Sequence, residues 1–186
     1  MSKYDIFEQG WSGDDTVCGW GSQLQHTVEV RKLLPHFLQF YNIERMNDAG
    51  CGDLFWIKTI FLRDVDYQGY DAFERATWGK LKNQGWKLEE FDIVNGVMRP
   101  CDLIMCRDVF IHLPNKDVLT ALDNFRKSGK YLLATSFVGA DNSIRMDAPR
   151  LQHAKLDLTK EPFNLGNPIG FIPEDYPHKI LGLWEL

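Results

Sequence analysis

The residues with the clearest chemistry form the run DAGCGD, residues 48–53, which follows the strand candidate ERMND and precedes the apolar run LFWIKTIFL. Glycine is favoured where the backbone takes a positive φ or comes close to a ligand. A strand, a glycine turn, a helix and an acid ending the next strand bind nucleoside cofactors, because the acid accepts hydrogen bonds from ribose hydroxyls. Asp71 follows Gly50 by roughly 20 residues, which is the spacing of that arrangement.

The glycine pattern departs from the dinucleotide form G-x-G-x-x-G. Gly50 and Gly52 fit its first two positions, but Phe55 stands where the third glycine belongs. Close packing of a helix start against a pyrophosphate is therefore poorly supported, and a nicotinamide oxidoreductase is the weaker alternative. The two glycines alone could also shape a tight turn and nothing more, but Asp48 and Asp71 together with them favour a nucleoside cofactor.

A second group of candidates follows the apolar run CDLIMC, residues 101–106. Asp108 and His112 come just after that predicted strand, where ligands bind in open α/β sheets. On a helical turn both side chains face one side, so that Asp108 can orient the imidazole and His112 can accept a proton from a hydroxyl or amine. Two questions stay open: His112 could simply pack at a helix entry, and Arg107 could pair with a protein carboxylate or with one on the ligand.

A parallel sheet would bring these candidates together, and the chain alternates strand and helix patterns as such a sheet requires. Strand patterns cover residues 44–48, 65–71, 86–94, 101–106, 130–137 and 178–186. Helical spacing covers 24–41, with a break or restart at Pro35, then 54–62 with its apolar side chains turned inward, and then 115–128, capped by Asn115 and ended by Gly129. We therefore predict an open α/β sheet.

The length of 186 residues is near the size of one domain, so we expect a single unit over 1–186. Residues 1–22 have no period and are expected to form an irregular arm. Residues 139–170 are rich in Gly, Pro, Asn and Asp, and we expect them to form a substrate-side loop or lid.

The composition narrows the classes of partner. A net charge of −5 argues against nucleic acid, whose binding needs clustered Lys and Arg. The four cysteines form no C-x-x-C pair, which argues against a metal site or a disulfide framework and favours reduced thiols. No run approaches the roughly 20 apolar residues of a membrane span, so a cytoplasmic protein without a membrane segment is expected.

At DAGCGD the sequence resembles motif I of the class I S-adenosylmethionine-dependent methyltransferases, an acidic residue followed by x-G-x-G-x-G. Asp48, Gly50 and Gly52 match that motif, and Leu54 replaces its third glycine. The resemblance extends over residues 20–137 and includes four motifs in the expected order, which is far more specific than one pair of glycines.

The second and third motifs would contact the adenosine part of the cofactor. YQGYDAF is similar to the second, which implies Asp71 at the ribose with Ala72 and Phe73 near the adenine. FDIV is similar to the third, which implies Asp92 at the adenine amino group and Ile93 on its ring.

Two further stretches extend the resemblance. DLIMCRDVFIHLP is similar to the fourth strand of these enzymes and the loop after it, so that Asp108 and His112 are the candidate catalytic pair. WGSQLQHT is similar to the Gly-Ser element that closes over the methionine end. The candidate cofactor-binding residues are Trp20, Gly21, Ser22, Asp48, Gly50, Gly52, Asp71, Ala72, Phe73, Asp92, Ile93 and Arg107.

The resemblance implies a Rossmann-like open, mostly parallel seven-stranded sheet with helices on both faces and with 178–186 as an antiparallel edge strand. It also implies an enzyme that uses S-adenosyl-L-methionine to methylate an oxygen or nitrogen of a small-molecule or sugar-like acceptor. CRDV stands where a nucleic-acid aminomethyltransferase carries Asn/Asp-Pro-Pro-aromatic, which disfavours that alternative. A non-catalytic protein that binds the cofactor is the other alternative.

Overall fold

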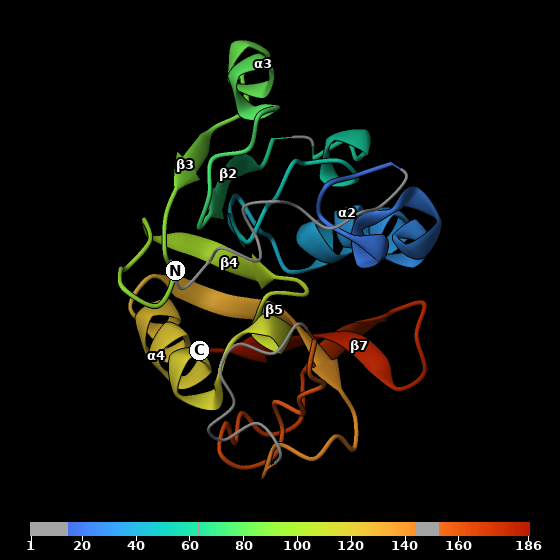
Figure 1. Ribbon diagram of the computed structural model, residues 1–186, viewed down its shortest axis with the longest axis vertical. Helices are drawn as coiled ribbons and strands as arrows, with labels where there is room; N and C mark the ends of the chain where they lie inside the picture. Colours follow the sequence, from blue (N-terminus) through green and yellow to red (C-terminus); the bar gives the residue numbers. More distant parts are fainter. Residues whose placement is uncertain (1–14, 63, 144–152) are drawn as a thin grey trace.

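A computed structural model of the chain describes residues 15–62, 64–143 and 153–186. Its centre is a seven-stranded sheet with the order β3-β2-β1-β4-β5-β7-β6 (Figure 1). The strands are β1 Arg45–Ala49, β2 Asp66–Asp71, β3 Leu88–Glu90, β4 Cys101–Cys106, β5 Gly129–Phe137, β6 Gly170–Pro173 and β7 Lys179–Glu185. Strands β1 to β5 are parallel, and β7 is antiparallel to both β5 and β6. The predicted fold class is confirmed.

The edge of the sheet differs from the prediction. We expected the C-terminal strand at the edge, but β7 lies between β5 and β6, and the short β6 forms the edge. Lys179, the first residue of β7, pairs with Phe137, the last residue of β5. The connection between β6 and β7 therefore lies beside the carboxyl end of β5, at the same end of the sheet as the residues predicted to bind a ligand.

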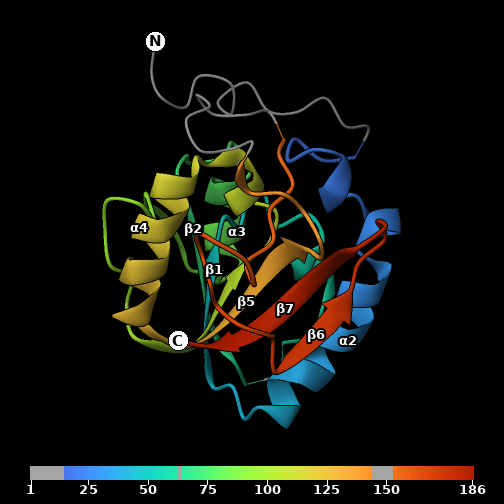
Figure 2. The same ribbon diagram turned by 90° about the horizontal axis from the view of Figure 1, so that it is seen from below.

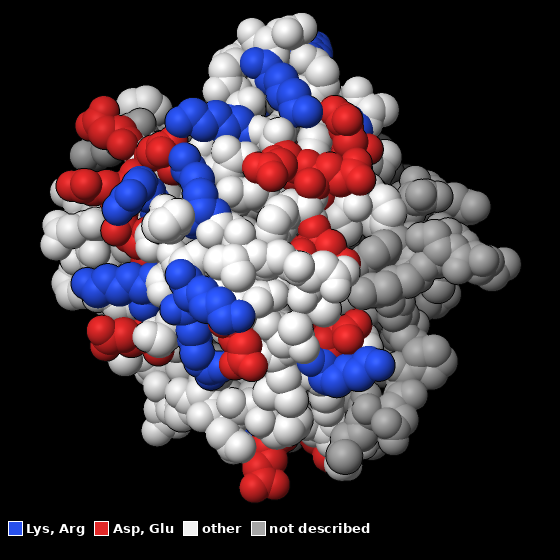
Figure 3. All heavy atoms as spheres, turned by 90° about the vertical axis from the view of Figure 1, so that its left-hand side faces the viewer, with Lys and Arg blue, Asp and Glu red and all other residues white. Residues whose placement is uncertain are grey.

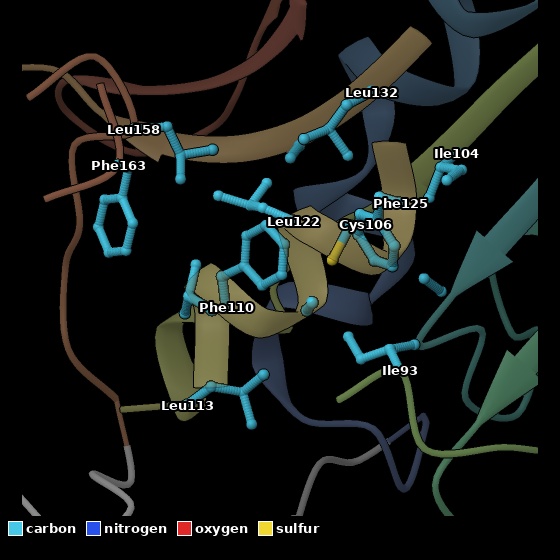
Figure 4. Packing of buried hydrophobic residues seen from close by; sticks show 14 of the residues in the cluster. Ile93, Ile104, Cys106, Phe110, Leu113, Leu122, Phe125, Leu132, Leu158 and Phe163 are labelled. Atoms are coloured by element: carbon cyan, nitrogen blue, oxygen red, sulfur yellow. The ribbon is translucent and has the colours of Figure 1, made fainter. Parts of the chain in front are cut away.

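Helices cover both faces of the sheet, as predicted (Figures 1 and 2). They are α2 Val28–Phe40, α3 Trp78–Asn83 and α4 Asn115–Arg126. The helices α2 and α3 bury Leu34 and Trp78 in one apolar cluster, and α4 buries Leu122 and Phe125 in a second one. Figure 4 shows the second cluster, in which the rings of Phe110 and Phe125 stack with centroids 5.9 Å apart. The sheet is therefore packed on both sides.

Helix α2 runs through Pro35 without the predicted break. Proline lacks an N–H group and so removes one backbone hydrogen bond from a helix. Leu34 and Leu38 are both buried beside it, with 0% and 4% of their surface exposed. The prediction was wrong because burial of this apolar stripe outweighs the local preference of one residue.

Helix α4 begins and ends differently from the prediction. Pro114 is its N-cap residue, and Asn115 is the first helical residue. The Nδ2 of Asn115 donates to the backbone oxygen of Asn142 at 3.0 Å, so this side chain ties α4 to the segment after β5 and does not cap the helix. Gly129 is the first residue of β5, because the chain passes from Lys127 almost directly into the strand.

The predicted helix over 54–62 is wrong. This stretch forms a single 3₁₀ turn, Ile57–Thr59. Leu54 has a φ of +57°, a left-handed conformation that an α-helix does not contain. Leu54 and Ile57 are buried but Phe61 is 79% exposed, so the apolar side chains pack as an irregular turn. The glycine turn after β1 is therefore not followed by a helix N-terminus.

One strand is shorter than predicted, and two short elements were missed. β3 covers only part of the predicted stretch 86–94. The Oδ1 of Asp92 accepts the N–H of Val94 at 2.9 Å, and this local turn competes with strand pairing. Neither α3 nor β6 was predicted, because elements of six and four residues are too short to show a period.

The face shown in Figure 3 carries Lys and Arg side chains interspersed with Asp and Glu. Side chains of the two signs lie next to one another, so this face presents no continuous cationic field of the kind that binds a phosphate backbone. In the part of the chain that the structure describes, no helix combines the length and the apolar composition that a membrane crossing requires.

Candidate functional site

A cavity of about 460 Å³ lies at the carboxyl ends of β1, β2 and β4, where ligands bind in open α/β sheets. Its volume is within the range of small-molecule sites. Every candidate residue from the sequence lines it. These residues are Trp20, Gly21, Ser22, Asp48, Gly50, Gly52, Asp71, Ala72, Phe73, Asp92, Ile93, Arg107, Asp108 and His112. The fold thus brings residues from separate stretches of the chain to one cavity.

The glycine turn has a backbone that only small residues adopt easily. Gly50 and Gly52 have φ values of +93° and +59°. A Cβ at Gly50 would overlap the side chain of Val109, and one at Gly52 would overlap the Sγ of Cys18. The N–H of Gly52 donates to the Oδ2 of Asp71 at 2.9 Å. The turn and the distant carboxylate are therefore joined by a hydrogen bond at the wall of one cavity.

Asp71 ends β2 and is 9% exposed. Besides Gly52, its Oδ1 accepts the N–H of Phe73 at 3.2 Å and the Nη2 of Arg75 at 3.1 Å. Burial raises the pKa of the Asp71 carboxyl, while Arg75 and the two backbone N–H groups act in the opposite direction. A carboxylate has about four lone-pair sites, so three donors leave room for a hydroxyl of a ligand.

Two contacts outside the predicted set hold the turn in place. The indole Nε1 of the fully buried Trp78 donates to the backbone oxygen of Gly52 at 2.8 Å. The Oγ1 of Thr16 donates to the Oδ2 of Asp53 at 2.7 Å, and the N–H of Asp53 donates to the Sγ of Cys18 at 3.3 Å. The turn is thus held from α3 and from the N-terminal segment, contacts that no local sequence pattern signals.

Two thiols lie beside the turn, of which Cys51 is buried and Cys18 is half-buried. Burial raises the pKa of the Cys18 thiol to about 12 and that of the Cys51 thiol well above its usual range. The thiolate is the reactive form of cysteine, so both thiols are poor nucleophiles in this environment.

Asp48 lies next to the turn at the end of β1 and is almost completely buried. The hydroxyl of Tyr67 on β2 donates to its Oδ2 at 2.7 Å. Burial raises the pKa of Asp48 to about 7, and the hydrogen bond from Tyr67 lowers it only in part. A cationic group of a ligand beside Asp48 would favour the ionised carboxylate.

One end of the cavity is largely apolar. Phe73, Phe91, Ile93 and Val94 line it, and Ile93 is 7% exposed. Asp92 lies among them, and its carboxylate accepts the N–H of Val94 at 2.9 Å and the Nδ2 of Asn95 at 2.7 Å. Apolar walls with an acid beside them suit a flat ring that carries a polar edge.

Four charged side chains meet at the opposite wall. Arg107 makes a bidentate pair with Glu174, with Nε to Oε1 at 2.7 Å and Nη2 to Oε2 at 2.8 Å. Lys179 lies 2.8 Å from the Oδ2 of Asp108 and 3.3 Å from the Oε2 of Glu174. We call Arg107, Asp108, Glu174 and Lys179 the charge quartet. Of the two partners expected for Arg107, a protein carboxylate or one on the ligand, this structure shows the first, which is Glu174.

The quartet changes the expected role of Asp108. Burial alone would raise the pKa of this carboxyl, but Arg107 and Lys179 hold it at about 2. Its Oδ1 accepts the hydroxyl of Thr135 at 3.2 Å, and its Oδ2 accepts Lys179. The sequence placed Asp108 against the imidazole of His112, whereas the structure places it against Lys179. Glu174 and Lys179 were missed because their β6–β7 hairpin was not recognised.

The rim of the cavity joins the N-terminal turns to the same hairpin. Trp20 begins the 3₁₀ turn Trp20–Ser22 and is 53% exposed. Its ring lies 3.4 Å, between centroids, from the imidazole of His26. The Nδ1 of His26 is 2.8 Å from the Oδ2 of Asp175. Trp20 is thus held at the opening, and its exposed ring is available to a ligand.

The expected lid is in part a packed segment. Residues 144–152 of this stretch lie outside the described residues. Beyond them, Leu156 and Leu158 are fully buried in the second apolar cluster. His153 lines the cavity. The described part of the stretch therefore packs against the sheet and brings one imidazole to the cavity.

The comparisons with known proteins bear on the fold. No family model and no curated protein matches the chain in sequence. Solved structures do match. The N-methyltransferase NodS from Bradyrhizobium japonicum WM9, in complex with S-adenosyl-L-homocysteine, has a TM-score of 0.69 at 18% identity, over 100% of this chain and 98% of that one.

Two further solved structures also match the fold of this chain. An S-adenosylmethionine-dependent methyltransferase from Clostridium acetobutylicum has a TM-score of 0.61 at 13% identity, over 86% of this chain and 92% of that one. The 1,6-didemethyltoxoflavin-N1-methyltransferase from Burkholderia thailandensis has a TM-score of 0.60 at 13% identity, over 83% and 77%. At these identities the likeness establishes the fold, which is that of the class I S-adenosylmethionine-dependent methyltransferases, as the sequence motifs predicted.

Proposed function

We propose that this protein is an S-adenosyl-L-methionine-dependent methyltransferase that acts on an oxygen or nitrogen atom of a small-molecule acceptor. The observation that carries the proposal is the hydrogen bond from the Gly52 N–H to the Asp71 carboxylate at the wall of one cavity. A turn that lets a ligand approach the backbone and an acid that accepts ribose hydroxyls lie side by side there.

The residues present fit this cofactor. Asp71 keeps acceptor capacity for the ribose, and Phe73 and Ile93 form apolar walls for the adenine. Trp20, which the sequence motifs assign to the methionine end, and Asp48 both line the cavity, and the Asp48 carboxylate suits an amino group. The overlap that a Cβ at Gly50 or Gly52 would create shows how closely this wall is built.

The charge of the cavity also suits a cofactor with a sulfonium. The Arg and Lys side chains that line it each pair with a carboxylate of the same wall: Arg75 with Asp71, Arg107 with Glu174 and Lys179 with Asp108. The remaining lining acids are Asp48, Asp53, Asp92 and Asp175. This surplus of acids favours a ligand with positive charge.

The same features disfavour a nicotinamide dinucleotide. Pyrophosphate binding in dinucleotide folds uses the N-terminus of the helix after the glycine turn. Among the described residues between β1 and β2, the chain forms only a 3₁₀ turn. A pyrophosphate would therefore meet an acid-rich wall without helix N–H donors.

A cofactor held by Asp71, Phe73 and Ile93 would supply the methyl group for a displacement at carbon, in which sulfur would keep the electron pair of the broken carbon–sulfur bond. The protein chiefly aligns the reactants, and such alignment supplies roughly 7 to 11 kcal/mol of a barrier. His112 lines the cavity and is proposed to take the proton that the acceptor loses, which contributes about 10² to 10⁴ in rate. Asp108 is proposed to act indirectly, because its Oδ2 holds the ammonium group of Lys179 in the charge quartet.

Calorimetric titration with S-adenosyl-L-homocysteine tests the proposal. We expect saturable binding to the wild-type protein and affinity about tenfold lower or worse in Asp71→Asn, because hydrogen bonds to a charged acceptor are lost. Asp123→Asn is the matched control, because Asp123 is an exposed acid on α4. NADH should not bind. The proposal fails if neither S-adenosyl-L-methionine nor S-adenosyl-L-homocysteine binds saturably.

A further inference from the structure

Aromatic rings gather at the end of the cavity beyond the charge quartet. Phe137 contacts the imidazole of His153 and the ring of Tyr176 edge to face, with centroids 6.0 Å and 5.8 Å away. The imidazole of His112 is 6.4 Å from that of His153, also edge to face. All four side chains line the cavity, and we call them the ring wall.

The ring wall is built from four separate parts of the fold. Phe137 ends β5 and is 2% exposed, and its backbone N–H donates to the oxygen of Leu156 at 2.7 Å. His112 ends the 3₁₀ turn Phe110–His112. His153 is adjacent to Ala154, whose N–H donates to the backbone oxygen of Ile111 at 2.9 Å. Tyr176 comes from the β6–β7 hairpin. Rings held by such anchors form a preorganised surface for a flat molecule.

Charge at this end of the cavity is internally balanced. Lys179 and Asp108 lie 2.8 Å apart, and Arg107 and Glu174 form the bidentate pair. Each Arg and Lys among the described residues that line the cavity is paired in this way, so an acceptor with a carboxylate or phosphate would have to break one of these pairs to gain a counter-charge from them, which is costly.

One further cation lies near the ring wall. The Nζ of Lys155 is 5.0 Å from the ring centroid of Tyr176 and 5.7 Å from that of Phe137. Lys155 is exposed and is not among the residues that line the cavity. Its ammonium already has two aromatic faces as partners, so it supports the rings and does not supply a buried anion site.

We infer that the methyl acceptor is an uncharged aromatic molecule, bound through its ring by Tyr176, which packs on the buried Phe137, with its hydroxyl or N–H directed to the imidazoles of His112 and His153. The inference rests on the proposed function and narrows its acceptor. Aromatic pairs favour offset or edge-to-face contacts, which the rings of the wall already make with one another. A sugar has no aromatic face for such contacts, and an anionic ring is disfavoured because each Arg and Lys among the described residues that line the cavity is already paired with a carboxylate.

Three probes separate these classes. They are 2-naphthol, a neutral aromatic alcohol; 6-hydroxy-2-naphthoate, which adds one carboxylate to the same ring; and methyl β-glucoside, a neutral molecule without an aromatic ring. Each is titrated by calorimetry into protein saturated with S-adenosyl-L-homocysteine. We expect 2-naphthol to bind at least about tenfold more tightly than either of the others. Tighter binding of the naphthoate or the glucoside, or no binding of 2-naphthol up to its solubility limit, would overturn the inference.

Two variants locate the binding. Tyr176→Leu removes one ring of the wall at a residue that is 41% exposed, so folding is preserved and 2-naphthol binding should fall about tenfold. Phe171→Leu is the matched control, because Phe171 is a 57% exposed ring on β6 outside the cavity lining. Equal loss in both variants, or none in Tyr176→Leu, contradicts the assignment. Absence of S-adenosyl-L-homocysteine binding would instead remove the proposed function, so the two failures are distinguishable.

Discussion

Replacing Asp48 by Asn removes an ionisable group that is 3% exposed at the end of β1. Burial raises the pKa of Asp48 to about 7, whereas an aspartate in an unfolded chain titrates near 3.9. The difference corresponds to roughly 4 kcal/mol of folding free energy. Asn has nearly the same shape and can still accept the hydroxyl of Tyr67, so the substitution isolates the effect of charge.

The direction in which pH changes the folding stability follows from proton binding to Asp48. Between about pH 4 and pH 7 the folded protein keeps a proton on Asp48 that the unfolded chain has lost. The stability of the wild-type protein therefore falls as the pH rises through this range and levels off above it. The Asn variant lacks this loss. It should match the wild type near pH 4 and exceed its free energy of unfolding by up to about 4 kcal/mol at pH 8.

Urea unfolding followed by tryptophan fluorescence, repeated from about pH 4 to pH 8.5, measures this difference. Asp123→Asn is the control, because its side chain is 69% exposed and its removal should leave the pH profile nearly unchanged. A difference between Asp48→Asn and wild type that is constant over the whole range would refute the reasoning, since Asp48 would then ionise alike in the folded and unfolded states.

Three other substitutions have expected outcomes. Trp78→Phe leaves the oxygen of Gly52 without its donor and should lower the free energy of unfolding by about 1 to 3 kcal/mol, measured in urea, and weaken S-adenosyl-L-homocysteine binding in calorimetry. Glu174→Gln removes a counter-charge from the buried Arg107 and should cost about 3 to 5 kcal/mol in urea unfolding, against under 1 kcal/mol for the exposed pair of Asp123. His112→Asn should slow methyl transfer by about 10² to 10⁴ while leaving cofactor affinity unchanged, and an unaltered rate would exclude His112 as the base.

The sequence predicted the inner part of the sheet well. β4 matches its prediction residue for residue, and β1, β2, β5 and β7 lie within a residue or two, because apolar runs bounded by turns carry a strong signal. The glycine turn and Asp71 could be paired from spacing alone. The cavity contains all of the candidates, because parallel strands bring their carboxyl ends to one edge.

The predictions that were wrong or missing concerned features that depend on contacts between residues distant in sequence. The left-handed Leu54 replaces a predicted helix by a turn, and nothing in an apolar run reveals such a backbone. Glu174, Tyr176 and Lys179 reach the cavity only because β6 and β7 pair beside β5. The role expected for Asp108 could not be settled without Lys179, which follows it by 71 positions.

The charge quartet also indicates which residues near the cavity can be substituted without moving the rest of the site. Glu174 and Lys179 lie at the two ends of the β6–β7 connection. Each forms an ion pair with a residue that follows β4, Glu174 with Arg107 and Lys179 with Asp108. Residues 175–178 lie between these fixed points. Replacing these four residues would alter the shape of the ring wall. The charge quartet at their ends and the glycine turn across the cavity would keep their geometry. Laboratory diversification for new acceptors should begin in those four positions.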